Sequence, residues 1–191
     1  MSKAATQTLS RQTRSIEWAR QAGIVAGASL FVAICARVTL PLPTPVPLTL
    51  QNFGVLAVAL LLGSRRGFAA LALYLAEGAA GLPVFTPAGV GGIAQVLGTT
   101  GGFLMAYPFV AFVAGWIYER TSRRFSRAVF SAFAAELVLF AGGLSWLYVL
   151  THSLALTAKW GLYWFVFAEV IKIMLAAAVA TQWTRRFTRQ S

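Results

Sequence analysis

The sequence predicts an all-α integral membrane protein that crosses the bilayer six times and carries a glycine-rich re-entrant loop on its outer side. Composition is the first observation: 58% of the 191 residues are hydrophobic and 11% are charged, which leaves too few polar side chains for a soluble fold of this length. The second is the grouping of apolar residues into six segments, and the third is a glycine- and proline-broken stretch between two of them. Together they indicate one polytopic domain.

Six apolar segments are separated by short polar or turn-forming stretches. A helix perpendicular to the membrane needs about 20 residues to cross the hydrocarbon. Two of the segments are shorter than that, so we expect their helices to extend into the flanking loops. The expected membrane helices cover residues 22–40, 48–63, 68–82, 102–118, 128–150 and 162–183.

Residues 83–102, between the third and fourth segments, cannot form a straight helix because they hold six of the 17 glycines and are broken by proline. The stretch is nevertheless apolar. Irregular backbone at membrane depth is tolerated only where protein or a cavity satisfies its amides. We therefore expect a re-entrant loop beside a binding cavity, with Gly91 and Gly92 in contact with the bound molecule.

Basic residues gather on one side of the six expected helices, and the positive-inside rule places that side, with both termini, in the cytoplasm. We expect a disordered cytoplasmic tail at residues 1–21 with a turn near Trp18, a membrane domain at 22–184 and a basic cytoplasmic end at 185–191. The glycine-rich loop and the turn at 41–47 then face outward. Thirteen of the 16 basic residues support this orientation: Lys3, Arg11, Arg14, Arg20, Arg65, Arg66, Arg120, Arg123, Arg124, Arg127, Arg185, Arg186 and Arg189.

Two charged residues, Glu169 and Lys172, interrupt the sixth apolar segment near its middle. A single charge at the bilayer centre costs about 2.5–3.5 kcal/mol even on insertion scales, unless it finds a partner or a polar ligand. The spacing of three places both side chains on one helical face. We expect them to form the core of a ligand site; the alternative is a structural ion pair that locks this helix to a neighbour. Glu77 and Glu136 have no basic helical neighbour, and the sequence assigns them no role.

The composition argues against several classes of protein. The charges form short clusters rather than a basic groove, so we expect no nucleic-acid partner. One cysteine and one histidine in separate segments, with no aspartate, argue against an intramembrane enzyme and against a metal site. The chain contains no P-loop sequence and therefore cannot hydrolyse ATP by that chemistry. We expect a non-enzyme without a cofactor.

The first expected helix carries small residues four positions apart, a pattern that lets another helix approach closely. Such a face docks a partner helix or packs inside the bundle, and the sequence leaves both interpretations open. The pairs are Ala22 with Ala26, Gly23 with Gly27 and Ser29 with Ala33.

Five motifs together resemble the biotin transporter BioY family in order and spacing. The resemblance spans most of the chain and implies the substrate-binding (S) component of an energy-coupling factor (ECF) transporter in a bacterial cytoplasmic membrane. It also implies capture of biotin from outside, with a membrane coupling protein and ATPase subunits as partners. The resemblance favours the small-residue face of the first helix, at Ala22, Gly23, Ala26 and Gly27, as the surface that docks the coupling protein. The motifs are Val-Pro-Leu-Thr-Leu-Gln at 46–51, Gly-Ser-Arg-Arg-Gly at 63–67, Gly-Ala-Ala-Gly-Leu-Pro-Val-Phe at 78–85, Leu-Gly-Thr-Thr-Gly-Gly-Phe at 97–103 and Glu-Val-Ile-Lys at 169–172.

Biotin would suit the site that the resemblance implies. Its ureido ring offers two N–H donors and one carbonyl acceptor, so Glu169 would accept an N–H while Lys172 donates to the carbonyl or neutralises Glu169. Gln51 is a further expected contact, with a helix-end cap as the alternative. Three aromatic side chains would wall the apolar bicycle, although such residues also anchor helices at membrane interfaces: Phe85, Trp146 and Trp164.

The chain departs from the family pattern at three places. The usual Pro-Gly-Asp is replaced by Phe167, Ala168 and Glu169, which keeps the charge type. An asparagine often follows the Pro-Val-Phe motif, but Thr86 stands here, and Thr99 replaces a common proline. These changes bear on affinity more than on substrate class. The alternatives are an S component for another vitamin and a structural or proton-conducting membrane protein.

Overall fold

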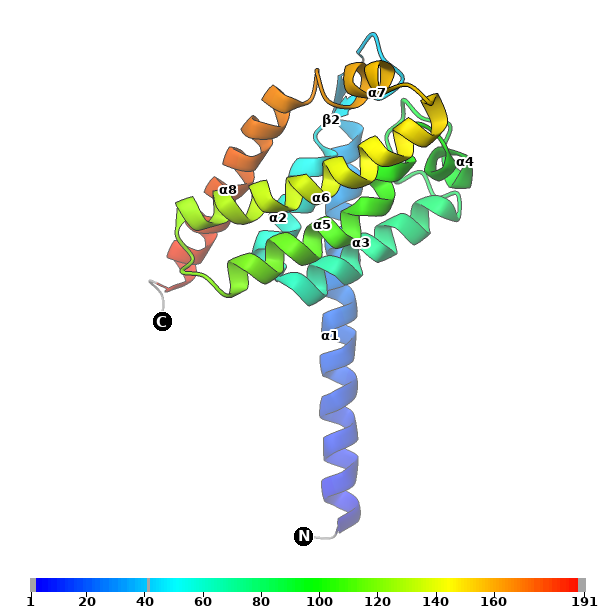
Figure 1. Cartoon of the computed structure of the whole chain (residues 1–191). Coiled ribbons are helices and arrows are strands. Elements are labelled where there is room, and N and C mark those ends of the chain that lie inside the picture. The colour runs from blue at the N-terminus through cyan, green and yellow to red at the C-terminus, as the bar shows by residue number, and fades with distance from the viewer. Residues whose placement is uncertain (1–2, 41, 189–191) are drawn as a thin grey trace.

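The computed structural model describes residues 3–40 and 42–188, and these form a helical bundle with one small β-ribbon (Figure 1). Two short strands, β1 (Thr39–Leu40) and β2 (Leu48–Thr49), pair antiparallel. The helices are α1 (Lys3–Arg37), α2 (Gln51–Leu62), α3 (Ser64–Ala79), α4 (Gly92–Leu97), α5 (Gly101–Glu119), α6 (Phe125–Thr151), α7 (Leu154–Gly161) and α8 (Val166–Thr188).

Each of the six apolar segments predicted from the sequence coincides with a helix: α1, α2, α3, α5, α6 and α8 in order. Four of these helices, α1 from Arg14 onward, α5, α6 and α8, are long and apolar enough to cross a membrane. By comparison, α2 is a shorter apolar helix of 12 residues. The prediction of an all-helical membrane protein is therefore confirmed at the level of fold class.

The N-terminal region differs from the disordered tail that the sequence predicted. α1 runs without a break from Lys3 to Arg37, and its first half projects beyond the other helices (Figure 1). Residues 3–21 contain neither glycine nor proline, the two residues that most disfavour a helix, so local propensity does not oppose one. An ion pair one turn apart joins Glu17 to Arg20 at 3.8 Å.

Besides α4, a six-residue helix inside the predicted loop, two elements were not predicted. Within the segment 41–47, expected only as a turn, the described residues 42–47 lead into the second strand of a β-ribbon, in which Thr39 pairs with Thr49. Proline cannot donate a backbone hydrogen bond or continue a helix, which favours this extended excursion. The other element is α7, whose N-cap Ser153 accepts a hydrogen bond from the Leu156 amide. Pro41 and Arg189 lie outside the described residues.

Close helix packing centres on α5, which contacts α6, α3 and α2. Small residues permit these contacts: a Cβ added at Gly102 would lie 2.5 Å from the carbonyl oxygen of Gly142 on α6, and one at Gly115 would lie 2.5 Å from the amide nitrogen of Ser64. α8 packs against α2 and α6. The four helices α2, α5, α6 and α8 thus enclose the interior in which the site lies.

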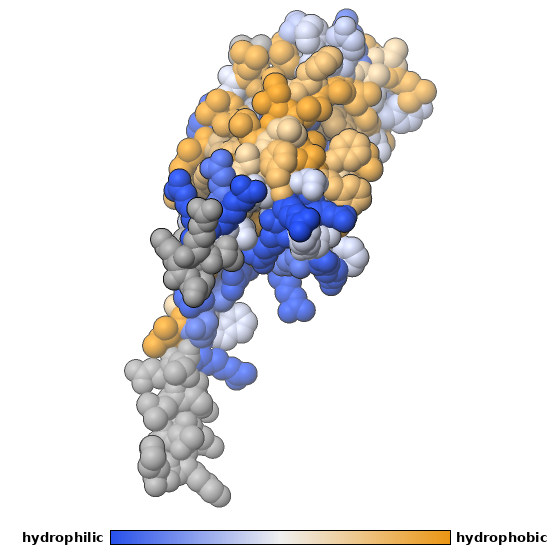
Figure 2. All heavy atoms as spheres, turned by 90° about the vertical axis from the view of Figure 1, so that its left-hand side faces the viewer, coloured by the Kyte–Doolittle hydropathy of each residue, from blue (hydrophilic) through white to orange (hydrophobic). Residues whose placement is uncertain are grey.

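The exterior of the bundle is largely apolar. Figure 2 shows a hydrophobic body that gives way to a hydrophilic band at the end where the first half of α1 projects. An apolar surface of this extent marks contact with a membrane. Exposed large apolar side chains on α5, α6 and α8 include Phe109, Phe133, Leu137, Val170 and Ile171.

Residues 83–100 fold back against the bundle through specific contacts. The Tyr74 hydroxyl donates to the Val84 carbonyl at 3.0 Å, and the ring of Phe85 packs edge-on against Tyr74. The two hydroxyls of Thr39 and Thr86 lie 3.0 Å apart and join this segment to the β-ribbon. The segment and the ribbon together cover one end of the helical interior.

Candidate functional site

A small cavity of about 50 Å³ lies inside the bundle between α2, α5, α6 and α8. The β-ribbon and the segment 83–100 also contribute to its lining. Polar side chains line one part of it: Thr49, Gln51, Asn52, Thr86, Gln95, Thr100, Glu169 and Lys172. Aromatic and aliphatic side chains line the rest: Val46, Pro47, Phe103, Leu104, Tyr107, Leu139, Phe140 and Phe165.

The predicted pair of charges meets inside the protein. Lys172 Nζ donates to Glu169 Oε1 at 2.7 Å, and the two residues are 6% and 5% exposed. α8 begins at Val166, so Glu169 lies in its first turn, where the helix dipole stabilises a negative charge. Glu169 and Lys172 therefore point into the bundle and line the cavity rather than face lipid.

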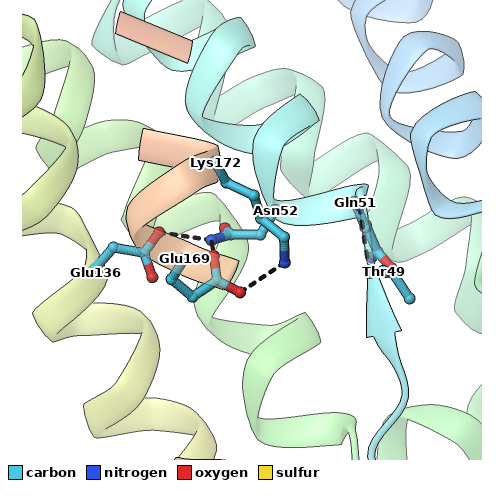
Figure 3. Close-up of polar contacts among 6 residues, drawn as sticks. All are labelled: Thr49, Gln51, Asn52, Glu136, Glu169 and Lys172. Carbon is cyan, nitrogen blue, oxygen red and sulfur yellow. Dashed lines mark hydrogen bonds and ion pairs between the residues drawn. The ribbon is translucent and has the colours of Figure 1, made fainter. Parts of the chain in front are cut away.

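Asn52 connects this pair to a second carboxylate (Figure 3). Its Nδ2 donates to Glu169 Oε2 and to Glu136 Oε1, both at 2.6 Å. Asn52 comes from α2, Glu136 from α6 and the charged pair from α8, so three helices meet in one polar cluster. We refer to Asn52, Glu136, Glu169 and Lys172 as the acid–amide cluster.

The acid–amide cluster holds two carboxylates and one ammonium. Hydrogen bonds to charged groups are each worth about 1.5–3 kcal/mol, and a buried polar atom without a partner carries a comparable penalty. Within the described part of the chain, the buried side-chain atoms that lack a hydrogen-bond partner include Glu136 Oε2, Asn52 Oδ1, Gln51 Nε2 and Gln95 Nε2. Three of these four residues line the cavity. The site thus offers unused donors and acceptors to a polar molecule.

Gln51 lies at the cavity, as the binding interpretation requires. It is the first residue of α2 and is 3% exposed. The N-cap of α2 is Leu50, which makes no side-chain capping hydrogen bond, and the backbone amide of Gln51 donates to the Thr49 hydroxyl at 3.3 Å. The alternative role of Gln51 as a side-chain cap is therefore not what the structure shows.

Five residues predicted to contact the bound molecule do not line the cavity. Phe85 is buried against Tyr74 and against Gly78, where even a Cβ would meet its ring. Gly91 and Gly92 lie at the start of α4, where their positive φ angles, 73° and 60°, serve the turn. The nearest link is indirect: the Gly91 amide donates to Oε1 of Gln95, which does line the cavity.

The two tryptophans also lie elsewhere. Trp146 Nε1 donates to the Gly98 carbonyl at 3.0 Å and so fastens α6 to the end of the glycine-rich segment. Trp164 is 41% exposed and stands edge-on to Tyr163 in the turn before α8. The aromatic wall is supplied instead by Phe103 and Phe165, whose rings stack with centroids 6.4 Å apart.

Sequence reasoning missed several lining residues for which a signal existed. Phe165 precedes Glu169 by four residues, and Phe103 and Tyr107 are four apart on α5, so helical spacing alone would have grouped them. Asn52 adjoins Gln51 inside an apolar segment, where a buried amide needs a partner. Its partner Glu136 was noted in the sequence without a role.

The fold and this cavity define a helical membrane protein with a buried polar site between its helices. Residues 3–189 match the model of the BioY family, and the chain belongs to that family.

Named relatives and a solved structure agree with the family assignment. Biotin transporter BioY of Thermotoga maritima is 38% identical over 157 residues, covering 80% of this chain and 90% of that protein. Biotin transporter BioY2 of Lactococcus lactis subsp. cremoris is 34% identical over 153 residues, covering 80% and 83%. The crystal structure of the S-component for biotin from an ECF-type ABC transporter has a TM-score of 0.79 at 25% identity, covering 88% of this chain and 93% of that one.

Proposed function

We propose that the protein binds biotin with high affinity and takes it up across the cytoplasmic membrane as the S component of an ECF-type transporter. The acid–amide cluster at the buried cavity is the observation that carries the proposal. Support comes from the BioY family match and from the likeness to the biotin S-component structure. The relatives are named as transporters, and we propose no enzymatic activity for this chain.

The chemistry of the cavity suits the two parts of biotin. The second oxygen of Glu169 and the nearby amides would receive the ureido N–H groups, while Lys172 would donate to the ureido carbonyl. The stacked rings of Phe103 and Phe165 would lie along the apolar bicycle. A volume of about 50 Å³ accommodates only a few water molecules. We propose that the β-ribbon and the segment 83–100, which contribute to the lining, move apart to admit biotin.

Equilibrium binding of labelled biotin to the purified protein tests this function. We expect saturable binding of one biotin per chain, displaced by unlabelled biotin and not by thiamine or riboflavin at the same concentration. Displacement by another vitamin would assign the S component to that substrate. The absence of binding, together with proton leak through protein-containing liposomes, would favour a proton-conducting protein.

We also infer that the chain crosses the membrane six times, with the short helices α2 and α3 completing the spans and residues 83–100 forming a re-entrant outer cover. Arg65, Arg66, Arg120 and Arg123 line one cavity and so share one end of the bundle, which the positive-inside rule places in the cytoplasm. Reporter fusions after Arg66 and Arg127 should both give cytoplasmic signals; an external signal at either position contradicts this orientation.

The energy for uptake would come from a membrane coupling protein and its ATPase subunits, and we propose the small-residue face of α1 as the docking surface. The structure separates the three pairs of this face. Ser29 and Ala33 are buried, and the Ser29 hydroxyl donates to Glu77 Oε2 at 2.6 Å. By contrast, Ala22, Gly23, Ala26 and Gly27 are exposed, and a Cβ added at either glycine would touch nothing within 4 Å.

Replacement of Gly27 by leucine should weaken assembly with the coupling protein by at least about tenfold while leaving biotin binding unchanged, because bulk blocks close helix approach. Ala26→Leu should act in the same way. Co-purification of the tagged coupling complex measures assembly. The control is Ala141→Leu, an equivalent change at an exposed alanine of α6. If the α1 variants assemble as well as the control, this face does not dock the partner.

A further inference from the structure

A second cavity, separate from the acid–amide cluster, lies at the basic end of the bundle. It has a volume of about 840 Å³ and lies where the turn between α2 and α3 meets the C-terminal end of α5. Both elements lie at the same end of the bundle in Figure 1. Four arginines line it, Arg65, Arg66, Arg120 and Arg123, together with one acidic residue, Glu119.

The single carboxylate in this cavity is committed to holding the backbone turn. Glu119 Oε1 accepts from the Ser64 amide at 3.0 Å, and its Oε2 accepts from the Ser64 hydroxyl at 2.7 Å. Gly63 makes the turn with φ 82°, and a Cβ there would collide with the Glu119 carboxylate. α5 is thereby fastened to the start of α3, and the four arginines and one glutamate leave the cavity with a formal charge of +3.

One of the four arginines, Arg120, is held by its neighbour Trp116. The guanidinium of Arg120 lies 4.2 Å from the centre of the Trp116 ring, and its Nη1 donates to the Trp116 carbonyl at 3.1 Å. Arg65 follows Ser64 directly and is exposed. Guanidinium groups bind phosphate oxygens through paired, charge-assisted hydrogen bonds, so this cavity is chemically suited to a phosphate group.

An apolar groove continues from the basic cavity. It has a volume of about 420 Å³ and is lined by Arg65, Phe68, Phe109 and Phe112. Arg65 and Phe112 line both spaces, so they are contiguous. The three phenylalanines form an aromatic wall in which Phe68 meets Phe109 and Phe112 edge-on at centroid distances of 5.8 and 6.4 Å. All three rings are exposed, and such a groove accepts a hydrocarbon chain.

From this pairing of a cationic cavity with an aromatic groove, we propose a binding site for one anionic phospholipid. Its phosphate would lie among Arg65, Arg66, Arg120 and Arg123, and an acyl chain would lie along Phe68, Phe109 and Phe112. The surplus of positive charge selects a headgroup with net negative charge over a zwitterionic one. The apolar groove distinguishes a lipid from a free phosphate ion, because only a lipid fills both spaces.

Native mass spectrometry of the purified full chain in neutral detergent tests the site by counting bound lipids. We expect dioleoyl phosphatidylglycerol to saturate at one tightly bound molecule per chain, and phosphatidylcholine to bind at least about tenfold more weakly, a difference of ~1.4 kcal/mol. Inorganic phosphate at the same concentration should not bind. Equal binding of the two lipids, or stoichiometric capture of phosphate alone, would overturn the proposal.

Substitutions locate the lipid and separate the site from general surface charge. Arg65→Gln combined with Arg120→Gln should weaken phosphatidylglycerol binding by at least about tenfold, whereas Arg124→Gln combined with Arg127→Gln should not, because these exposed arginines do not line the cavity. Phe109→Gln should weaken binding through the groove alone. Unchanged melting temperature and biotin binding establish that the variants are folded. An equal loss of phosphatidylglycerol binding in the two double variants would indicate general attraction to lipid charge. A protein dimer that only Arg65→Gln with Arg120→Gln abolishes would identify a second copy of the chain as the occupant. Either result overturns the proposal.

Discussion

Lys172→Met should reduce biotin affinity by at least about tenfold, equivalent to ~1.4 kcal/mol. Methionine keeps most of the length and apolar volume of the lysine stem and removes only the ammonium. Lys172 is the cation that contacts Glu169, and Glu136 lies across Asn52 from the same pair. Without the ammonium, the two carboxylates cannot both remain charged in this buried space, so one takes up a proton and loses acceptor capacity. The donor that we propose for the ureido carbonyl is lost as well.

Isothermal titration of biotin into the purified variants measures the effect. Lys159→Met is the matched control, because Lys159 lies exposed on α7 and away from the cavity. We expect the control to bind biotin as the unmodified chain does. If Lys172→Met binds with unchanged affinity while its melting temperature falls, the pair serves only to hold α8 in place.

Asn52→Leu should lower both the stability of the protein and its biotin affinity. Among single substitutions in the acid–amide cluster, we expect this one to cause the largest loss of stability. Leucine is close to asparagine in size but donates no hydrogen bond, so Glu136 Oε1 and Glu169 Oε2 each lose their 2.6 Å partner. Each buried acceptor left without a donor costs about 1–3 kcal/mol. Thermal unfolding in detergent, followed by biotin titration at a temperature where the variant is folded, measures both effects.

A double-mutant cycle identifies the source of that loss. Adding Glu136→Leu removes one of the two carboxylates that lost the Asn52 donor. The double variant should therefore lose less stability than the two single variants together, by about 0.5–3 kcal/mol. Gln182→Leu, an amide-to-leucine change at an exposed position of α8, is the control and should be neutral. Strict additivity of Asn52→Leu and Glu136→Leu would show that the two side chains do not depend on one another.

The six apolar helices could be predicted because each carries its signal locally, whereas α4 and α7, of six and eight residues, were not predicted. The length of each apolar run defined the segments, and the charges of Glu169 and Lys172 inside the last run indicated a site. The start of α1 was missed because polar composition near a terminus resembles disorder, whereas helix propensity there is unopposed. The β-ribbon was missed because two-residue strands are too short to show alternation.

The composition of the cavity could be predicted only in part. Glu169, Lys172 and Gln51 were found from their chemistry, but their neighbours depend on which helix faces approach one another. Trp146 and Trp164 illustrate the limit: both are aromatic, yet one fastens α6 to Gly98 and the other is exposed. Tertiary packing, rather than residue type, determines that Phe103 and Phe165 line the cavity.

The polar link between α2, α6 and α8 shows the same dependence on packing. Asn52 and Glu136 are 84 residues apart in sequence, and nothing local connects them. Only the approach of α2 to α6 and α8 brings one amide between two carboxylates. When a chain contains both a buried amide and a membrane carboxylate without a basic neighbour, a hydrogen bond between them is nevertheless a reasonable prediction.

The most direct measurement of the central claim is the affinity for labelled biotin of the unmodified chain and of Glu169→Gln, compared with their melting temperatures. Glutamine preserves the shape of the side chain but removes its charge and half of its acceptor capacity. We predict saturable binding of one biotin per chain for the unmodified protein, and binding at least about tenfold weaker (~1.4 kcal/mol) for a folded Glu169→Gln variant. Equal affinities with a lower melting temperature for Glu169→Gln would contradict the assignment and leave Glu169 and Lys172 as a structural ion pair.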